Sequence, residues 1–139
     1  DLEKSKEMVD QLNLKEHTFF LPFLLSKMKL IHYYNLADAV IDQFTLGAYG
    51  TSSMEAMACG KAVIIDFDIA RYAPYFKELP PVLIAKSVEE IYLQMKKLSE
   101  NKNDTCEQVG QKSREWIMEF HSIKNNFDKV IELCQGCLS

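Results

Sequence analysis

The chain has 139 residues, of which 47% are hydrophobic and 26% are charged, and its formal net charge is −4. This balance is typical of one soluble globular domain, and the negative charge excludes the basic surface that a nucleic-acid partner normally requires. No apolar run has the length of a membrane span, and no targeting segment opens the chain. Because the chain starts with Asp1 instead of Met and leads at once into an expected helix, we expect residues 1–139 to be a single domain belonging to a longer protein.

In chain order, the first part of the sequence predicts two helices and two buried strands. The spacing of apolar residues predicts a helix over 3–13, and the apolar run 17–25 suits a buried parallel strand that leads into a loop. Ser26 can cap a helix that extends to about residue 36, and 38–44 is the second strand. The apolar face of that helix is expected to hold Leu30, Tyr33, Tyr34 and Ala37.

The same alternation continues beyond the second strand. A glycine-rich loop at 46–50 precedes a short helix at 52–59, which Gly60 ends as the first residue beyond it. Residues 61–67 and 80–85 are the third and fourth expected strands. Ser87 and Glu90 have the spacing of a capping box, which predicts a helix start. Three amphipathic helices follow, with apolar faces at Val88, Ile91, Tyr92, Met95 and Leu98, then at Cys106, Val109, Ser113, Ile117 and Phe120, and last within 123–137.

Strands that alternate with helices predict an α/β fold, because parallel strands need helical crossovers that cover both faces of the sheet. We therefore expect a Rossmann-like parallel sheet with helices on both faces. It has fewer strands than a complete domain of this type, so its first strands are expected to be missing at the amino end.

The four cysteines are too few for a disulfide scaffold of this length, but Cys134 and Cys137 have CxxC spacing. No second CxxC and no nearby histidine completes a zinc site, so no metal is predicted. Helical spacing instead places Cys134 on a buried stripe with Phe127, Val130, Ile131 and Leu138, as a thiol in a reducing cytosol.

The stretch 47–68 carries the clearest chemical signal. Gly47 and Gly50 lie in a loop that passes directly into a helix at the carboxyl end of a strand, which is where open α/β sheets bind ligands. The first amides of the helix and its dipole favour an anion such as a diphosphate, and hydroxyls at 51–53 add donors. Asp66 and Asp68, at the next strand end, are a weaker candidate for metal or sugar binding.

Glu55 has two interpretations. It stands one turn into the helix, where its carboxylate can face the same ligand. Ser52 and Glu55 also fit the S-x-x-E capping box, in which Glu55 would merely close the end of the helix.

The segments ADAVIDQF, LGAYG and TSSMEAMACGKAVI (37–64) resemble the signature of retaining glycosyltransferases with the GT-B fold, the glycogen-synthase-like "group 1". That signature has a strand reading AD-V-V-V, a glycine loop, and a helix reading L-E-A-M-A-x-G-x-P-V. REWIMEFHS (114–122) is similar to the family's R-x-x-V-x-x-x-H/F-S element before its last helix. The resemblance covers about residues 8–138.

The resemblance implies that this chain is the carboxyl-terminal, donor-binding half of such an enzyme. Its substrate would be a nucleoside diphosphate sugar, with no cofactor, no metal and no catalytic residue within these 139 residues. Glu55 would accept hydrogen bonds from the ribose hydroxyls. The implied donor-binding residues are Gly47, Ala48, Tyr49, Gly50, Thr51, Ser52, Ser53 and Glu55, and the implied base pocket comprises Leu21, Pro22, Phe23 and Met28.

The sequence departs from the family pattern in three places. Gly47 occupies the position of the first Glu of the usual motif, which contacts the transferred sugar, although a branch of the family carries D-Q-x-x-x-G-x-Y-G here. Ala62 replaces a proline. Nothing matches the Arg and Lys that neutralise the diphosphate, and we do not expect Lys61 to substitute for them.

The sequence thus predicts a retaining glycosyltransferase whose acceptor domain lies outside this chain. That domain would be its protein partner, and any membrane contact of the full cytoplasmic protein would be peripheral and made by that half. A non-enzymatic nucleotide or nucleotide-sugar binding module is the main alternative. A nucleotide-sugar epimerase is disfavoured because no G-x-G-x-x-G follows a first strand.

Overall fold

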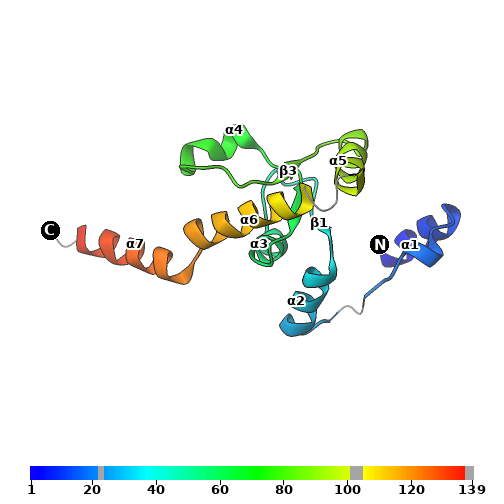
Figure 1. Cartoon of the computed structure of the whole chain (residues 1–139), viewed down its shortest axis with the longest axis horizontal. Coiled ribbons are helices and arrows are strands. Elements are labelled where there is room, and N and C mark those ends of the chain that lie inside the picture. The colour runs from blue at the N-terminus through cyan, green and yellow to red at the C-terminus, as the bar shows by residue number, and fades with distance from the viewer. Residues whose placement is uncertain (22–23, 101–104, 137–139) are drawn as a thin grey trace.

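The computed structural model describes residues 1–21, 24–100 and 105–136 (Figure 1). Its elements, in chain order, are α1 (Leu2–Gln11), the 3-10 helix η1 (Lys15–His17), α2 (Lys27–Leu36), β1 (Ala39–Ile41), α3 (Thr51–Ala58), β2 (Ala62–Ile65), α4 (Ile69–Tyr72), the 3-10 helix η2 (Ala73–Tyr75), β3 (Leu83–Ile84), α5 (Val88–Glu100), α6 (Glu107–Phe120) and α7 (Ile123–Gly136).

The described strands form one parallel sheet in the order β1-β2-β3. Ala39 pairs with Ala62, and Ile64 pairs with Leu83, so β2 lies in the middle of the sheet. All four residues of β2 are buried, as expected for a parallel strand covered on both faces. The predicted α/β class with a parallel sheet is confirmed, although each strand is shorter than the sequence indicated.

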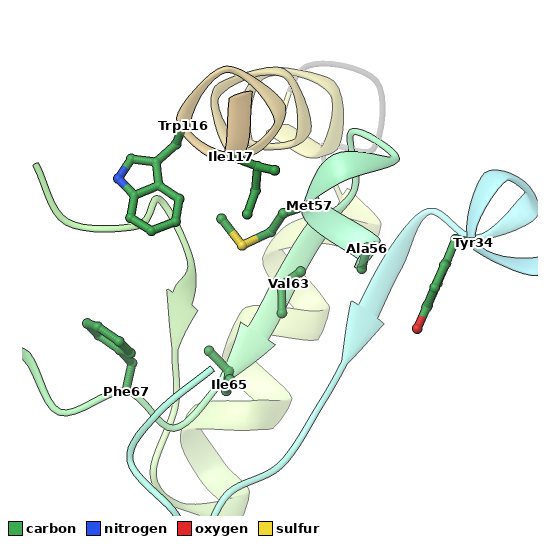
Figure 2. Packing of buried hydrophobic residues seen from close by; sticks show 8 residues of the cluster. All are labelled: Tyr34, Ala56, Met57, Val63, Ile65, Phe67, Trp116 and Ile117. Atoms are coloured by element: carbon green, nitrogen blue, oxygen red, sulfur yellow. The ribbon is translucent and has the colours of Figure 1, made fainter. Parts of the chain in front are cut away.

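Successive residues of β2 point into two different hydrophobic clusters. Val63 and Ile65 face Met57 of α3 and Ile117 of α6, as Figure 2 shows. Ala62 and Ile64 belong to the second cluster, which includes Leu98 of α5. Side chains alternate across a strand, so helices cover both faces of the sheet, as predicted. The result is consistent with a Rossmann-like half-domain.

Several predicted helix ends are confirmed by their hydrogen bonds. The Ser26 hydroxyl accepts from the Lys29 amide at 3.4 Å, at the start of α2. The Ser87 hydroxyl accepts from the Glu90 amide at 3.2 Å, at the start of α5. Gly60 follows α3 with a φ of 73°, the left-handed conformation typical of a glycine just beyond a helix.

The predicted strand at 17–25 is wrong for the described part of that range. His17 ends η1, and residues 18–21 and 24–25 belong to no strand. The side chain of Phe19 is 87% exposed. A strand requires a neighbour that completes its backbone hydrogen bonds, and the described sheet does not extend to this segment. In Figure 1 the segment leads from α1, which stands apart from the sheet, toward α2.

The predicted buried stripe on the last helix is also wrong. No residue of α7 is buried, Cys134 is exposed, and Phe127 is 61% exposed. Figure 1 shows the reason, since α7 continues beyond the end of α6 and away from the sheet. Cys137 and Leu138 lie outside the described residues.

The predicted apolar faces of the other helices are only partly correct. Tyr34 is buried against α3, but Tyr33 on the same predicted face of α2 is exposed. On α5, Leu98 is buried, whereas the exposed positions are Val88, Tyr92 and Met95. The predicted face of α6 is confirmed, with Ser113 and Ile117 buried.

Candidate ligand site at the glycine loop

The glycine loop, defined here as residues 42–50, follows β1 and lies against the chain that leaves β2. Backbone bonds from the Asp42 amide to the Ile64 carbonyl (3.1 Å) and from the Asp66 amide to the Gln43 carbonyl (3.2 Å) extend the pairing of these strands. The Asp68 amide also donates to the Gly47 carbonyl at 2.8 Å. The loop is thereby fixed at the carboxyl edge of the parallel sheet, where ligands bind in this class of fold.

The side chain of Gln43 holds the turn within the loop. Its Oε1 accepts from the amides of Thr45 (3.0 Å) and Leu46 (2.8 Å), and its Nε2 donates to the Ala48 carbonyl. An amide side chain suits this role because it can donate and accept at once. The sequence signal for it was the Asp42-Gln43 pair that precedes the glycines, to which sequence analysis gave no role.

Gly47 is required by the shape of the loop. Its φ is 63°, and a Cβ built on it would lie 3.3 Å from the Cβ of Asp68. A side chain there would meet both backbone strain and a close contact. The absence of glutamate at this position is therefore built into the conformation of the loop.

The loop delivers the chain to the start of α3. Gly50 is the N-cap residue, in extended conformation, and no side chain caps the helix. The geometry of any α-helix leaves its first amides without an acceptor inside the helix. Thr51 and Ser52 are exposed, whereas Ser53 is fully buried and its hydroxyl donates to the Asp42 carboxylate. The three predicted hydroxyls therefore differ in position. Those of Thr51 and Ser52 belong to exposed residues, and that of Ser53 is hydrogen-bonded to the glycine loop.

The capping-box interpretation of Glu55 is wrong. Since α3 begins at Thr51, Ser52 is already inside the helix and cannot be its N-cap. The Glu55 carboxylate instead forms an ion pair with the Lys27 ammonium group, at the start of α2. The Glu55 side chain is 22% exposed. The ion pair is a contact between α2 and α3 that sequence spacing could not indicate.

Tyr34 completes this contact between the two helices (Figure 2). Burial raises the pKa of its hydroxyl above the usual range, and the nearby charge of Glu55 raises it further, whereas a hydrogen bond with Ser52 acts in the opposite direction. The Tyr34 hydroxyl is therefore neutral at physiological pH. It lies among Lys27, Ser52 and Glu55 and gives this end of α3 a polar surface.

The ring of Tyr49 points away from the exposed end of α3, into a cluster of aromatic side chains. It stacks on Phe67 with ring centroids 5.9 Å apart and meets Trp116 edge-on at 5.8 Å. Its hydroxyl lies 3.1 Å from Nε2 of His121. Among the predicted donor-binding residues, Tyr49 therefore packs its partly buried side chain against the core, and its backbone belongs to the loop.

The structure describes half of the predicted base pocket. Leu21 and Met28 are both exposed, while Pro22 and Phe23 lie outside the described residues. Met28 lines a cavity of about 410 Å³ along α2, which Leu21 does not line. The other lining residues are Leu25, Lys29, His32 and Tyr33.

The weaker candidates have structural roles here. The Asp68 carboxylate accepts from the Arg71 amide at 3.2 Å and so caps α4. Lys61 donates to the Asn35 carbonyl at 3.0 Å. Among residues 1–21, 24–100 and 105–136, no group of three or more histidine, cysteine, aspartate or glutamate side chains could hold a metal ion. Within the same ranges, no helix combines the length and the apolar character needed to cross a membrane.

A parallel sheet whose strand leads through a glycine loop into a helix is the arrangement at which open α/β folds bind ligands. The chain belongs to the glycosyl transferases group 1 family, whose model matches residues 1–116. The matched range includes the glycine loop, α3 and the Lys27–Glu55 pair. Searches of curated proteins and of solved structures found no match. Membership of this family supports glycosyl transfer as the activity.

Proposed function

We propose that this chain binds the nucleoside diphosphate of a sugar donor, as the donor-binding half of a retaining GT-B glycosyltransferase. The observation that carries the proposal is the exposed amino end of α3, which the glycine loop presents at the carboxyl edge of the sheet. The family match supports the reaction class. The site suits a ligand that carries both a diphosphate and vicinal hydroxyls.

The diphosphate would lie against the first amides of α3. These amides and the positive end of the helix dipole favour an anion, and the exposed hydroxyl of Thr51 can donate to the same oxygens. Gly50 has no side chain that would keep the ligand away from the backbone. A Cβ built on Gly50 would lie 3.9 Å from its nearest atom, an Asp42 oxygen, and would otherwise point into the open space proposed for the ligand. In the proposed reaction, these donors stabilise the negative charge that develops on the departing diphosphate.

Glu55 would accept hydrogen bonds from the ribose. A carboxylate has two oxygens and about four acceptor positions, so Lys27 occupies only part of its capacity. The positive charge of Lys27 also reduces the repulsion between Glu55 and a nearby diphosphate. Met28 and the cavity beside it are proposed as the base side of the site, together with Leu21, Pro22 and Phe23. The acceptor would be bound by a second domain, as the GT-B fold implies.

A substitution at Thr51 tests the proposal, because helix stability and anion binding should respond in opposite directions. Thr51→Glu places a negative charge in the first turn of α3, where it stabilises the helix by about 0.3–1 kcal/mol. The same charge should repel a diphosphate and abolish measurable binding of UDP, GDP and ADP in calorimetric titrations. Thr51→Gln is the matched neutral control, which keeps a side-chain donor, and should bind far more tightly than Thr51→Glu. Equal affinity in Thr51→Glu and Thr51→Gln would contradict the proposed diphosphate site.

The main alternative is a module that binds a nucleotide sugar without transferring the sugar. Gly47 favours it, because the loop conformation does not accommodate the glutamate that resemblance places at the transferred sugar. The full-length protein distinguishes the two. Release of nucleoside diphosphate from a nucleotide sugar in the presence of acceptor supports transfer, whereas binding without turnover supports the module.

A further inference from the structure

His121 lies where α6 ends and α7 begins. It is the C-cap residue of α6, and its amide donates to the Ile117 carbonyl at 2.8 Å. Its ring is half-buried and turns toward the glycine loop, where Nε2 lies 3.1 Å from the Tyr49 hydroxyl. This hydrogen bond connects two residues separated by 72 positions in the sequence. It therefore joins the loop to a part of the chain that is distant in sequence and outside the proposed ligand site.

The ring of Tyr49 is fixed on several sides. Phe67 stacks on it at an interplanar angle of 21°, and Trp116 and His121 both meet it edge-on, at 83° and 81°. These contacts hold the plane of the ring, while the hydrogen bond to His121 fixes how far the hydroxyl extends along that plane. Together they determine where the Cα of Tyr49 can lie.

The position of Tyr49 sets the start of α3. Tyr49 immediately precedes Gly50, whose carbonyl accepts the first helical hydrogen bond, from the Met54 amide at 3.1 Å. The Gly50 and Thr51 amides follow directly from the Tyr49 backbone. A shift of the Tyr49 ring therefore moves the amides to which we assign the diphosphate.

Two apolar rings could fill the same space, so packing alone does not require the Tyr49 hydroxyl and the His121 nitrogen at this contact. The Tyr49 hydroxyl and the His121 imidazole are both partly removed from water, and a polar group that loses its partner in such a place destabilises the arrangement. Each group satisfies the other, which gives the contact a defined direction that an apolar pair would lack.

We propose that His121 is a positioning residue for the proposed donor site, acting through Tyr49 on the backbone of the glycine loop. The inference rests on the proposed function for its ligand. The contact with the loop rests on the geometry alone. His121 itself would not touch the nucleotide.

The experiment uses Tyr49→Phe, His121→Phe and the double variant, each of which keeps an aromatic ring at both positions and removes the hydrogen bond. Titration with UDP and GDP, well below the melting transition, should show each single variant weakened by about three- to tenfold. The double variant should be no weaker than the singles, because all three lose the same bond. His121→Gln can still donate to or accept from Tyr49 and should recover most of the affinity.

A merely structural role is excluded by two further measurements. Leu98→Val loosens the second hydrophobic cluster, to which Tyr49 does not belong, and should lower the melting temperature without changing affinity. Amide hydrogen exchange at 47–53, without nucleotide, should be faster in His121→Phe than in Leu98→Val. Unchanged exchange at these residues in His121→Phe would overturn the inference, whether or not wild type binds nucleotide. A wild type that binds no nucleotide would contradict only the proposed function. Unchanged affinity of both phenylalanine variants, where wild type binds clearly, would also overturn it.

Discussion

The backbone carbonyl of Gly60 occupies the space that a side chain at Gly110 would need. A Cβ built on Gly110 would lie 2.0 Å from the carbonyl oxygen of Gly60 and 2.8 Å from its carbon. The chain just beyond α3 therefore passes directly against α6. This approach brings α6 over the face of β2 that carries Val63 and Ile65, and so closes the larger hydrophobic cluster.

Replacing Gly110 with alanine should destabilise the protein strongly. The contact is with backbone, which cannot turn aside as a flexible side chain would, so α3 and α6 must separate. Forcing one methyl group into such a site costs about 1–3 kcal/mol, which exceeds the gain of about 0.5–1 kcal/mol from alanine in a helix. Urea denaturation measures the loss. Gly136→Ala is the matched control, because a Cβ there meets nothing within 4 Å, and its stability should equal or exceed that of wild type.

Local signals in the sequence predicted much of the sheet and the helix ends. Gly60 after α3 and Ser26 before α2 could be recognised because each acts on its own neighbours. The close approach of Gly60 to Gly110 could not, because it depends on packing between residues 50 positions apart along the chain. The Lys27–Glu55 pair is hidden for the same reason, since spacing within α3 favoured a cap that the structure does not form.

The wrongly predicted strand at 17–25 and the wrongly predicted buried stripe on α7 have a common physical cause. The apolar run at 17–25 and the stripe on α7 both have the pattern of buried elements, but the pattern does not specify what buries them. In the described residues neither Phe19 nor Phe127 is covered. The glycine loop could be recognised because Gly47 and Gly50 interrupt the apolar pattern between an expected strand and an expected helix, which is a local signal.

Replacing Gly50 should weaken ligand binding more than it lowers stability. Gly50 has an ordinary backbone conformation and space around it, so Gly50→Val should lower stability only by the loss of a favoured N-cap residue, about 1 kcal/mol. Its side chain should nevertheless keep a diphosphate away from the backbone and weaken UDP binding severely. Gly50→Ser restores a good N-cap, so its melting temperature reports whether folding is intact. If Gly50→Val melts early and binds normally, the glycine serves only the fold.

Glu55→Gln tests the ribose contact without disturbing a cap. The Lys27–Glu55 pair is largely exposed on the lysine side, at 63%, so its loss should change stability by less than about 1 kcal/mol. Nucleotide affinity should fall by roughly tenfold or more, because a charged acceptor for two hydroxyls becomes a neutral one with one oxygen. Lys27→Met breaks the same ion pair but keeps the carboxylate, and should weaken binding much less. An equal loss in the two variants would assign the effect to the ion pair instead of the ribose.

His121 should make the stability of the protein depend on pH. Burial lowers the pKa of its imidazole below the usual value of 6.5, and the positive charge of Lys129 on α7 lowers it further. Well above pH 6.5, the usual pKa of the group, the ring is neutral in both the folded and the unfolded chain, so it contributes no slope there. As the pH falls through that value, the unfolded chain binds a proton that the folded chain resists, and the free energy of unfolding decreases.

The melting temperature of wild type should therefore drop between pH 7.5 and pH 5.5, and His121→Phe should show a smaller drop. Lys129→Gln removes the second cause and should reduce the slope partly, while His17 and His32 are present in every variant. Titration of the His121 ring protons by NMR gives the folded pKa directly, and a value at or above 6.5 would contradict this origin of the pH dependence.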